Sequence, residues 1–248
     1  MTTRKHEEIA ASLTRDILVG QYRCGERLPS ERDLAGRFEA NRGAVREAMK
    51  KLEQLGLATV QPGGARVQPL HEASLDVIGH MLALGEVPDE DLVDQILQVM
   101  NGLVRLAAES AVQRASDAEI AGIRDRLQPL LQTDPDHDCH ALARFELMSA
   151  IMEASGNLVC RLIARSLLEQ FAPRMVPLEG HVVLDYDAHR EYAARLDRAL
   201  AERDVGALRE TFDAMSRLNR ESARRAFAAV RATGAAGAAP TSKPGSTS

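Results

Sequence analysis

The order of patterns in the first 70 residues constrains the fold more than any other feature of the chain. Apolar residues recur at helical spacing over residues 6–18, which predicts a first amphipathic helix. A Pro/Ser turn follows, in which Ser30 stands three residues before Asp33, as in a capping box with Asp in place of Glu. A second helix is therefore expected from this turn to about Phe38.

A third helix and a hairpin complete this pattern. Asn41 is the expected N-cap, Gly56 is the expected end, and one apolar stripe runs between them: Val45, Met49, Leu52 and Leu55. Two short strands, at 57–60 and 66–68, then flank a turn that contains Pro62, Gly63 and Gly64. Helices in this order with a hairpin behind them are typical of a winged helix-turn-helix.

Charge is distributed unevenly along the chain, although the net charge is only −5. Residues 1–70 hold 12 Lys and Arg against 9 Asp and Glu, a net of +3, whereas the other residues hold 19 against 27, a net of −8. A mildly basic first domain followed by an acidic larger one suggests that only the first domain meets a polyanion.

Basic side chains at the start of the third helix point to DNA. Arg42 and Arg46 are four residues apart, so they share the helix face that would enter a major groove. Arginine reads guanine with two hydrogen bonds, and Asn41 is suited to a base or a phosphate. Beside the flexible tip at Gly63 and Gly64, Arg66 is expected to reach a flanking phosphate or the minor groove.

The stretch GERLPSERDLAGRFEANRGAVREAMKKLEQLGL, residues 25–57, resembles the DNA-binding domain of the GntR family of bacterial transcription regulators. The resemblance covers about residues 8–69. It implies double-stranded DNA as the partner and a set of DNA-binding positions, which with those predicted from the residues are Arg32, Asn41, Arg42, Gly43, Arg46, Gly63, Gly64 and Arg66. Asn41 stands where Ser or Thr is common in the family, so the operator sequence is expected to differ.

The remainder of the chain has helical periodicity without a convincing strand. The expected helices make a bundle of about seven, over residues 73–85, 89–114, 117–132, 139–155, 157–172, 181–202 and 204–229. The fold class is therefore mainly α: a winged helix-turn-helix domain at 1–70, a helical domain at 71–231, and a disordered tail at 232–248 that is small, polar and rich in Pro and Gly. No catalytic motif is found, and no enzyme is predicted.

The second domain resembles that of the FadR subfamily, on the segments MEASGN at 152–157 and LDRALAERDVGAL at 196–208. That resemblance implies an effector-binding domain that also forms a homodimer. Many members bind a divalent metal with one Asp and three His, whose positions fall here on Arg144, Met148, Ala193 and Met215, and an effector-binding Arg falls on Met100. No metal or other cofactor is predicted. The three methionines would instead line a soft apolar pocket, although they would equally serve as core filler.

Two classes of effector stay open after this comparison. The loss of the metal ligands resembles the branch of the subfamily that senses long-chain acyl-CoA, which implies an apolar or acyl effector such as acyl-CoA or a fatty acid. A small organic acid, with or without a metal, is the alternative. A remote alternative to a ligand-responsive regulator is a nucleoid-type DNA binder without sequence preference, which would require a larger basic surface.

Other features are expected to carry no site. The run of acidic and His residues between Asp134 and His140 is interpreted as a solvated acidic loop around Pro135. The cysteines, Cys24, Cys139 and Cys160, lack the spacing of a zinc or disulfide framework. No apolar run is long enough to span a bilayer, and the charged start does not resemble a signal peptide, so a cytoplasmic protein with no membrane partner is expected.

Overall fold

The computed structural model describes residues 2–61, 64–132 and 137–237, which divide into two compact units. The first unit contains residues up to 89 together with 166–174, and the second contains 90–165 together with those from 175 onward. The boundary predicted after residue 70 lies too early. Val77, only 2% exposed, belongs to the same buried cluster as the first three helices, so the segment after the wing packs with the winged domain.

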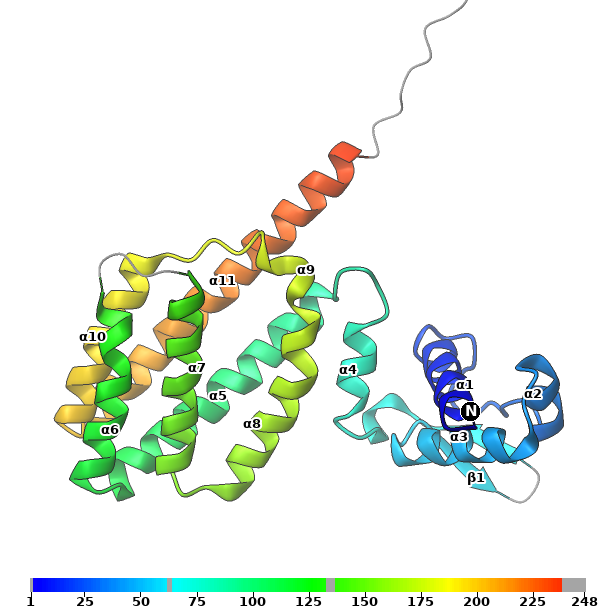
Figure 1. Cartoon of the computed structure of the whole chain (residues 1–248). Helices are drawn as coiled ribbons and strands as arrows, with labels where there is room; N and C mark the ends of the chain where they lie inside the picture. Colours follow the sequence, from blue (N-terminus) through cyan, green and yellow to red (C-terminus); the bar gives the residue numbers. More distant parts are fainter. Residues whose placement is uncertain (1, 62–63, 133–136, 238–248) are drawn as a thin grey trace, which may run out of the picture. The chain divides into compact units, whose positions relative to one another are not determined.

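The first unit has the predicted winged helix-turn-helix (Figure 1). Its elements in chain order are α1 (Thr2–Leu18), α2 (Glu31–Arg37), α3 (Arg42–Gln54), β1 (Ala58–Gln61), β2 (Gly64–Val67), the short 3₁₀ helix η1 (Leu70–Glu72) and α4 (Val77–Leu82). The two strands pair antiparallel, with Ala58 opposite Val67 and Gln61 opposite Gly64. The mainly helical fold class with a small wing is thereby confirmed.

The predicted capping residues set the ends of α2 and α3. The Ser30 side chain accepts a hydrogen bond from the Asp33 backbone N–H at 3.3 Å, and Asn41 Oδ1 accepts one from the Ala44 N–H at 2.8 Å. Gly56 ends α3 with a φ of +70°, and a Cβ at this position would lie 2.9 Å from the Glu72 carbonyl oxygen. Only glycine satisfies both the left-handed backbone and this close approach.

One buried ion pair in this unit was not predicted from the sequence. Asp16 on α1 is 7% exposed and accepts from Arg37 Nη2 at 2.9 Å. The same guanidinium donates to the Tyr22 hydroxyl at 3.3 Å and lies 4.9 Å from the centre of the Phe38 ring. These contacts join α1 to α2 and leave the Asp16 carboxylate paired, which matters because an unpaired buried charge is strongly destabilising.

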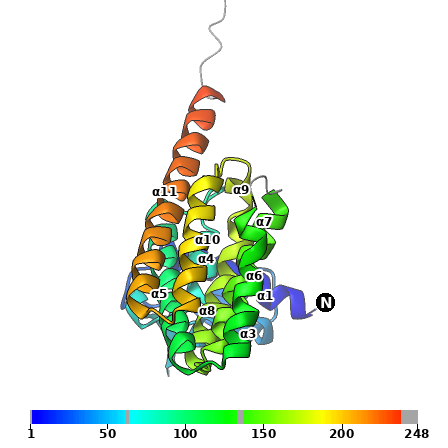
Figure 2. The same ribbon diagram turned by 90° about the vertical axis from the view of Figure 1, so that its left-hand side faces the viewer.

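The longer elements of the rest of the chain follow the predicted spans to within several residues, whereas a short helix at 176–179 was not predicted. The elements are α5 (Glu90–Arg114), α6 (Asp117–Leu127), η2 (Gln128–Leu131), α7 (His137–Ala154), α8 (Leu158–Phe171), η3 (Ala172–Arg174), α9 (Val176–Glu179), α10 (Tyr186–Ala201) and α11 (Val205–Gly237). The second unit is a bundle in which α11 packs on α5 and α10 (Figures 1 and 2). The predicted tail at 232–248 starts too early, because α11 continues to Gly237; residues 238–248 lie outside the described part.

A single buried cluster holds the bundle together. Its members come from α5, α6, α7, α8, α10 and α11 and include the fully buried Leu127, Leu200 and Leu208. Small buried side chains, such as Ala107 and Ala108 on α5, let the helices approach closely. Across the described ranges, no helix has both the length and the apolar character that a membrane span requires.

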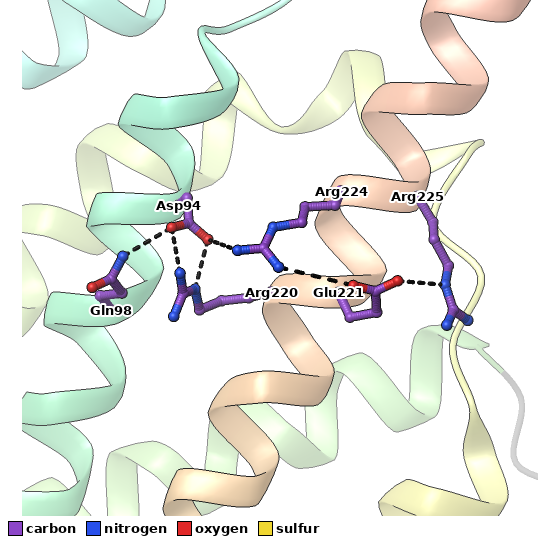
Figure 3. Close-up of polar contacts among 6 residues, drawn as sticks. All are labelled: Asp94, Gln98, Arg220, Glu221, Arg224 and Arg225. Carbon is purple, nitrogen blue, oxygen red and sulfur yellow. Dashed lines mark hydrogen bonds and ion pairs between the residues drawn. The ribbon is translucent and has the colours of Figure 1, made fainter.

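An ion-pair network connects α5 to α11 on the flank of this core (Figure 3). Arg220 donates to both carboxylate oxygens of Asp94 at 2.6 Å, Gln98 donates to the same carboxylate at 2.8 Å, and Arg224 lies 3.6 Å away. Asp94 and Arg220 side chains are 22% and 25% exposed. The hydrogen bonds from Arg220 hold the pKa of Asp94 below its usual value of 3.8.

Replacement of Asp94 by Asn is expected to lower the free energy of unfolding by about 1–3 kcal/mol near neutral pH, because Arg220 loses a charged bidentate partner. A carboxyl pKa that is depressed in the folded state stabilises above the unfolded value and loses this effect as the pH falls. The difference between wild type and Asp94→Asn should therefore shrink as the pH falls below 3.8. Urea unfolding of wild type and variant, near neutral pH and below pH 3.8, measures this difference. A difference that does not depend on pH would contradict the electrostatic explanation.

Candidate functional site

A row of basic side chains follows the exposed face of α3 from its first residue. Arg42, Arg46 and Lys50 are spaced by four residues and are all exposed, whereas Val45 and Met49 between them are buried. The first turn of α3 has no acidic residue. Positive charge at a helix N-terminus interacts unfavourably with the helix macrodipole and destabilises the isolated helix. A contact with a DNA phosphate or base would offset this destabilisation.

The three basic residues differ in their present partners. Arg46 Nε donates to the Glu31 carboxylate at 2.9 Å, which joins the recognition helix to α2, and Lys50 pairs with Glu47 at 2.8 Å. Within the described residues, Arg42 makes no ion pair. A DNA contact by Arg42, which stays a prediction, would therefore break no ion pair of the described residues, whereas one by Arg46 would compete with Glu31. Surface pairs of this kind are worth about 1 kcal/mol or less, so the exchange is cheap.

Asn41 and Gly43 have a structural task in addition to the predicted DNA contact. The Asn41 side-chain oxygen is used in capping α3, which leaves its amide nitrogen for a base or phosphate. A Cβ on residue 43 would lie 3.2 Å from that oxygen, closer than an ordinary contact. Gly43 thus leaves room for the cap, and the DNA contacts of both residues stay predictions.

One side chain of the wing has a partner that was not predicted. Arg66 lies on β2, and its Nη1 donates to the Gly25 carbonyl at 2.5 Å, which anchors the loop between α1 and α2; its DNA contact stays a prediction. Gly64 is exposed with a φ of +133°, and Gly63 lies outside the described residues. Arg32, in the first turn of α2, is 80% exposed and 3.8 Å from Asp33, a position open to a DNA backbone.

The five predicted effector residues lie in the bundle in different surroundings. Ala193 on α10 is 4% exposed and part of the core cluster, and Met100 on α5 packs against that cluster. Met148 on α7 and Met215 on α11 are half-buried. Arg144 on α7 is the one charged residue of the five, and its Nη2 donates to Asn219 Oδ1 on α11 at 2.9 Å. Burial alone lowers the pKa of the Arg144 guanidinium.

A pair of buried histidines beside Arg144 was missed by sequence reasoning. The predicted acidic loop is wrong at its carboxyl end, because α7 begins at His137 and includes His140, which is 2% exposed. The His140 ring meets the rings of His189 at 5.3 Å and Tyr186 at 5.1 Å, edge to face. The i, i+4 spacing of His140 and Arg144 was the available signal, since it puts both side chains on one helix face.

A surface depression of about 720 Å³ opens at the start of α10. Its lining combines three carboxylates and one arginine with apolar side chains: Leu131, Asp185, Asp187, Ala188, Arg190, Glu191 and Ala194. None of the five predicted effector residues takes part in it. This depression is therefore not the predicted apolar pocket.

Comparison with known proteins agrees with the winged fold. Residues 5–67 match the family described as bacterial regulatory proteins, gntR family. Residues 5–67 form a GntR-family DNA-binding domain. It is 26% identical over 215 residues to the HTH-type transcriptional regulator Mce2R of Mycobacterium tuberculosis, covering 86% of this chain and 89% of that protein.

Two further comparisons show how far the similarity extends along this chain. It is 31% identical over 158 residues to the putative L-lactate dehydrogenase operon regulatory protein of Escherichia coli, covering 63% of this chain and 60% of that protein. The solved structure of Lar, which controls the agr system of Listeria monocytogenes, is 16% identical, covers 90% of this chain and 96% of its own, and superimposes with a TM-score of 0.51. That likeness concerns the fold alone.

The metal positions implied by the FadR-subfamily resemblance do not fit a divalent cation in this chain. Arg144, Met148, Ala193 and Met215 offer a guanidinium, two thioethers and a methyl group, none of which suits Zn²⁺ or a similar ion at such a site. In the described part of the chain, no three His, Cys, Asp or Glu side chains gather closely enough to hold a metal. His140 and His189 alone would bind one weakly.

Proposed function

We propose that this chain is a GntR-family transcription regulator that binds a short palindromic operator as a homodimer, and that a small molecule bound by its helical domain alters this binding. The exposed row of Arg42 and Arg46 at the start of α3 carries the first part of the proposal, because it places two guanidinium groups where a recognition helix reads guanine. Gly64 and Arg32 supply further contacts from the wing and from α2. Two-fold symmetry of the protein implies two half-sites.

An exposed apolar stripe on α8 supports the homodimer. Leu158, Val159 and Leu162 are 56%, 66% and 57% exposed, and helical spacing puts them on one face. Apolar side chains gathered on one exposed face are typical of an association surface. We place the dimer contact of the helical domain on this stripe.

Two classes of effector fit the helical domain. Half-buried Met148 and Met215 support an apolar or acyl effector of the kind found in the acyl-CoA-responsive branch of the FadR subfamily. The cationic Arg144 and the buried His189 between the same helices favour an acid instead. The relative named for an L-lactate dehydrogenase operon and another named for a galactonate operon agree with this second class.

Selection of bound sequences from a random DNA library tests the DNA-binding proposal. Wild type is expected to enrich one palindrome, with footprints on two half-sites about one helical turn apart. Binding should weaken with salt on every sequence but remain stronger on the palindrome. Equal affinity for all sequences would reject this proposal in favour of the nucleoid-type alternative.

A double variant on α8 tests the homodimer. Leu158→Glu with Leu162→Glu adds charges that repel across a two-fold axis, and we expect sedimentation to report a monomer at concentrations where wild type is a dimer. Operator affinity should fall by at least about tenfold, because the two half-sites are then bound separately. Val183→Glu, at a 73% exposed position before α10, is the matched control. An unchanged mass for the double variant would move the interface elsewhere.

A further inference from the structure

A carboxylate from a second helix holds the Arg46 side chain. Arg46 Nε donates to both oxygens of Glu31, at 3.1 Å to Oε1 and at 2.9 Å to Oε2. Glu31 is the first residue of α2, and Arg46 lies one turn after the start of α3, fifteen residues later in the chain. The pair therefore bridges the two helices of the helix-turn-helix.

Buried side chains fix both helices close to this pair. Leu34, three residues after Glu31 on α2, and Val45, next to Arg46 on α3, are fully buried in the same core cluster. Ser30 caps α2 immediately before Glu31. A carboxylate in the first turn of a helix also interacts favourably with the helix macrodipole. The position of the acceptor that Arg46 meets is thus set by the core, although the pair lies at the surface.

The terminal nitrogens of Arg46 have a different role from Nε. A guanidinium has one N–H donor on Nε and four on the two Nη atoms. Both bonds to Glu31 start from Nε, and in the described part of the chain the Nη atoms have no hydrogen-bond partner. Competition between DNA and Glu31 therefore concerns Nε alone. A bidentate contact with O6 and N7 of guanine needs two neighbouring donors, which Nη1 and Nη2 supply.

The other basic residues of this face have no such support from a second helix. Arg42 makes no ion pair within the described residues, and Lys50 pairs with Glu47 on its own helix. The Arg46 side chain is 66% exposed and that of Glu31 is 39% exposed. Pairs as exposed as this one contribute little to folding. Its effect is therefore on the direction of the guanidinium more than on stability.

We propose that Glu31 is a positioning residue that sets the sequence specificity of the protein: it holds Nε of Arg46 so that the two Nη groups face the edge of a guanine in the major groove. An unsupported arginine loses rotamer freedom when it reads a base. Arg46 has lost part of this freedom to Glu31 beforehand, so less is lost on binding. The inference rests on the proposed function, because it concerns how the operator is read.

The same carboxylate weakens binding to incorrect sequences. A phosphate contact requires no fixed direction of the guanidinium, so it gains less from the support than a guanine contact does. The negative charge of Glu31 also repels phosphates near Arg46. Specificity is a difference between two affinities, and Glu31 raises that difference from both sides.

Two variants of Glu31 test this proposal on the palindrome selected by wild type and on its single-base variants. Glu31→Ala removes the acceptor, whereas Glu31→Gln removes the charge but keeps an oxygen that accepts from Nε. We expect discrimination at one base pair per half-site to fall about three- to tenfold in Glu31→Ala, the effect of ordering one long side chain, and to fall less in Glu31→Gln. Unchanged discrimination, or an equal loss in both variants, overturns the proposal.

Glu47→Ala is the matched control, because it removes one exposed carboxylate from the same helix-turn-helix and releases a lysine instead of an arginine. Glu31→Ala and Glu47→Ala should both bind random DNA more tightly than wild type, since each removes a negative charge near the phosphates. Only Glu31→Ala should lose discrimination at a base pair. An equal loss in Glu47→Ala would show a general effect of charge and contradict the positioning role.

A double variant separates support of Arg46 from direct reading of a base by Glu31. Arg46→Ala should relax the same base pair as Glu31→Ala, and the combination should lose nothing further there. Loss at a different base pair, or a further loss in the double variant, would show that Glu31 itself reads a base such as cytosine, against the proposal. Equal weakening of Arg46→Ala on every sequence would make Arg46 a phosphate contact and reject it as well.

Thermal unfolding of Glu31→Ala distinguishes a positioning role from a structural one. Its melting temperature should stay close to those of wild type and Glu47→Ala, because the pair is exposed. A much lower melting temperature, with binding weakened equally on all sequences, would make Glu31 a structural residue and overturn the proposal. Failure of wild type to select a palindrome rejects the proposed function, whereas selection by wild type with unchanged discrimination in Glu31→Ala rejects this inference alone.

Discussion

Arg42→Ala is expected to weaken binding to the selected operator by about 1–3 kcal/mol, or about 5- to 150-fold in Kd. Arg42 is exposed at the first position of α3 and makes no ion pair within the described residues. Its guanidinium donors are therefore available to DNA, and the variant loses the hydrogen bonds that they make. If the side chain reads a guanine, discrimination at one base pair per half-site should relax at the same time. Fluorescence anisotropy with the palindrome and single-base variants measures both quantities.

Two control variants determine which contact Arg42 makes. Arg42→Lys keeps the charge but loses the planar pair of donors, so it should retain a phosphate contact and lose a bidentate base contact. Arg198→Ala removes one exposed positive charge from the helical domain and should bind DNA as wild type. Equal weakening of Arg42→Ala on every sequence, with a shallower salt dependence, would show that Arg42 binds a phosphate instead of a base.

Leu200→Ala is expected to lower the free energy of unfolding by about 2–5 kcal/mol. Leu200 is fully buried in the cluster that joins the helices of the bundle, and truncation removes packed atoms at a place where helices from distant parts of the chain meet. Urea unfolding followed by far-UV circular dichroism measures the change. Leu106→Ala, on α5 at 48% exposure, is the matched control. An effect of equal size for both variants would contradict the assignment of Leu200 to the core.

The local sequence predicted the elements that position the DNA interface. Ser30 and Asn41 cap their helices through bonds to residues three positions away, and Gly56 ends α3 in a left-handed conformation. Such interactions depend on near neighbours in the chain, so residue type and spacing suffice to predict them. The ends of the bundle helices, from Glu90 to Ala201, follow from capping residues and prolines in the same way.

Contacts between distant residues were not accessible to the same reasoning. Arg66 donates to a carbonyl 41 residues away, a contact that local spacing did not reveal, and its predicted DNA contact stays a prediction. The pairing of Asp16 with Arg37 was equally invisible to local spacing. His140 was assigned to a solvated loop because its acidic neighbours are polar, whereas α7 turns it into the bundle. Neighbours in sequence did not reveal which side of a helix another helix would cover.

The amino-acid sequence by itself determined the winged domain, the helical second domain and the exposed arginines of α3, because helical periodicity, caps and glycine stops are local properties of the chain. Only the tertiary structure decided that Arg144, His189 and Asn219 meet, and that Arg46 rests on Glu31. The electrostatic free energy of a charge depends on burial and on every neighbour in space. Those neighbours come from separate helices, and their meeting is fixed by the packing of the bundle as a whole.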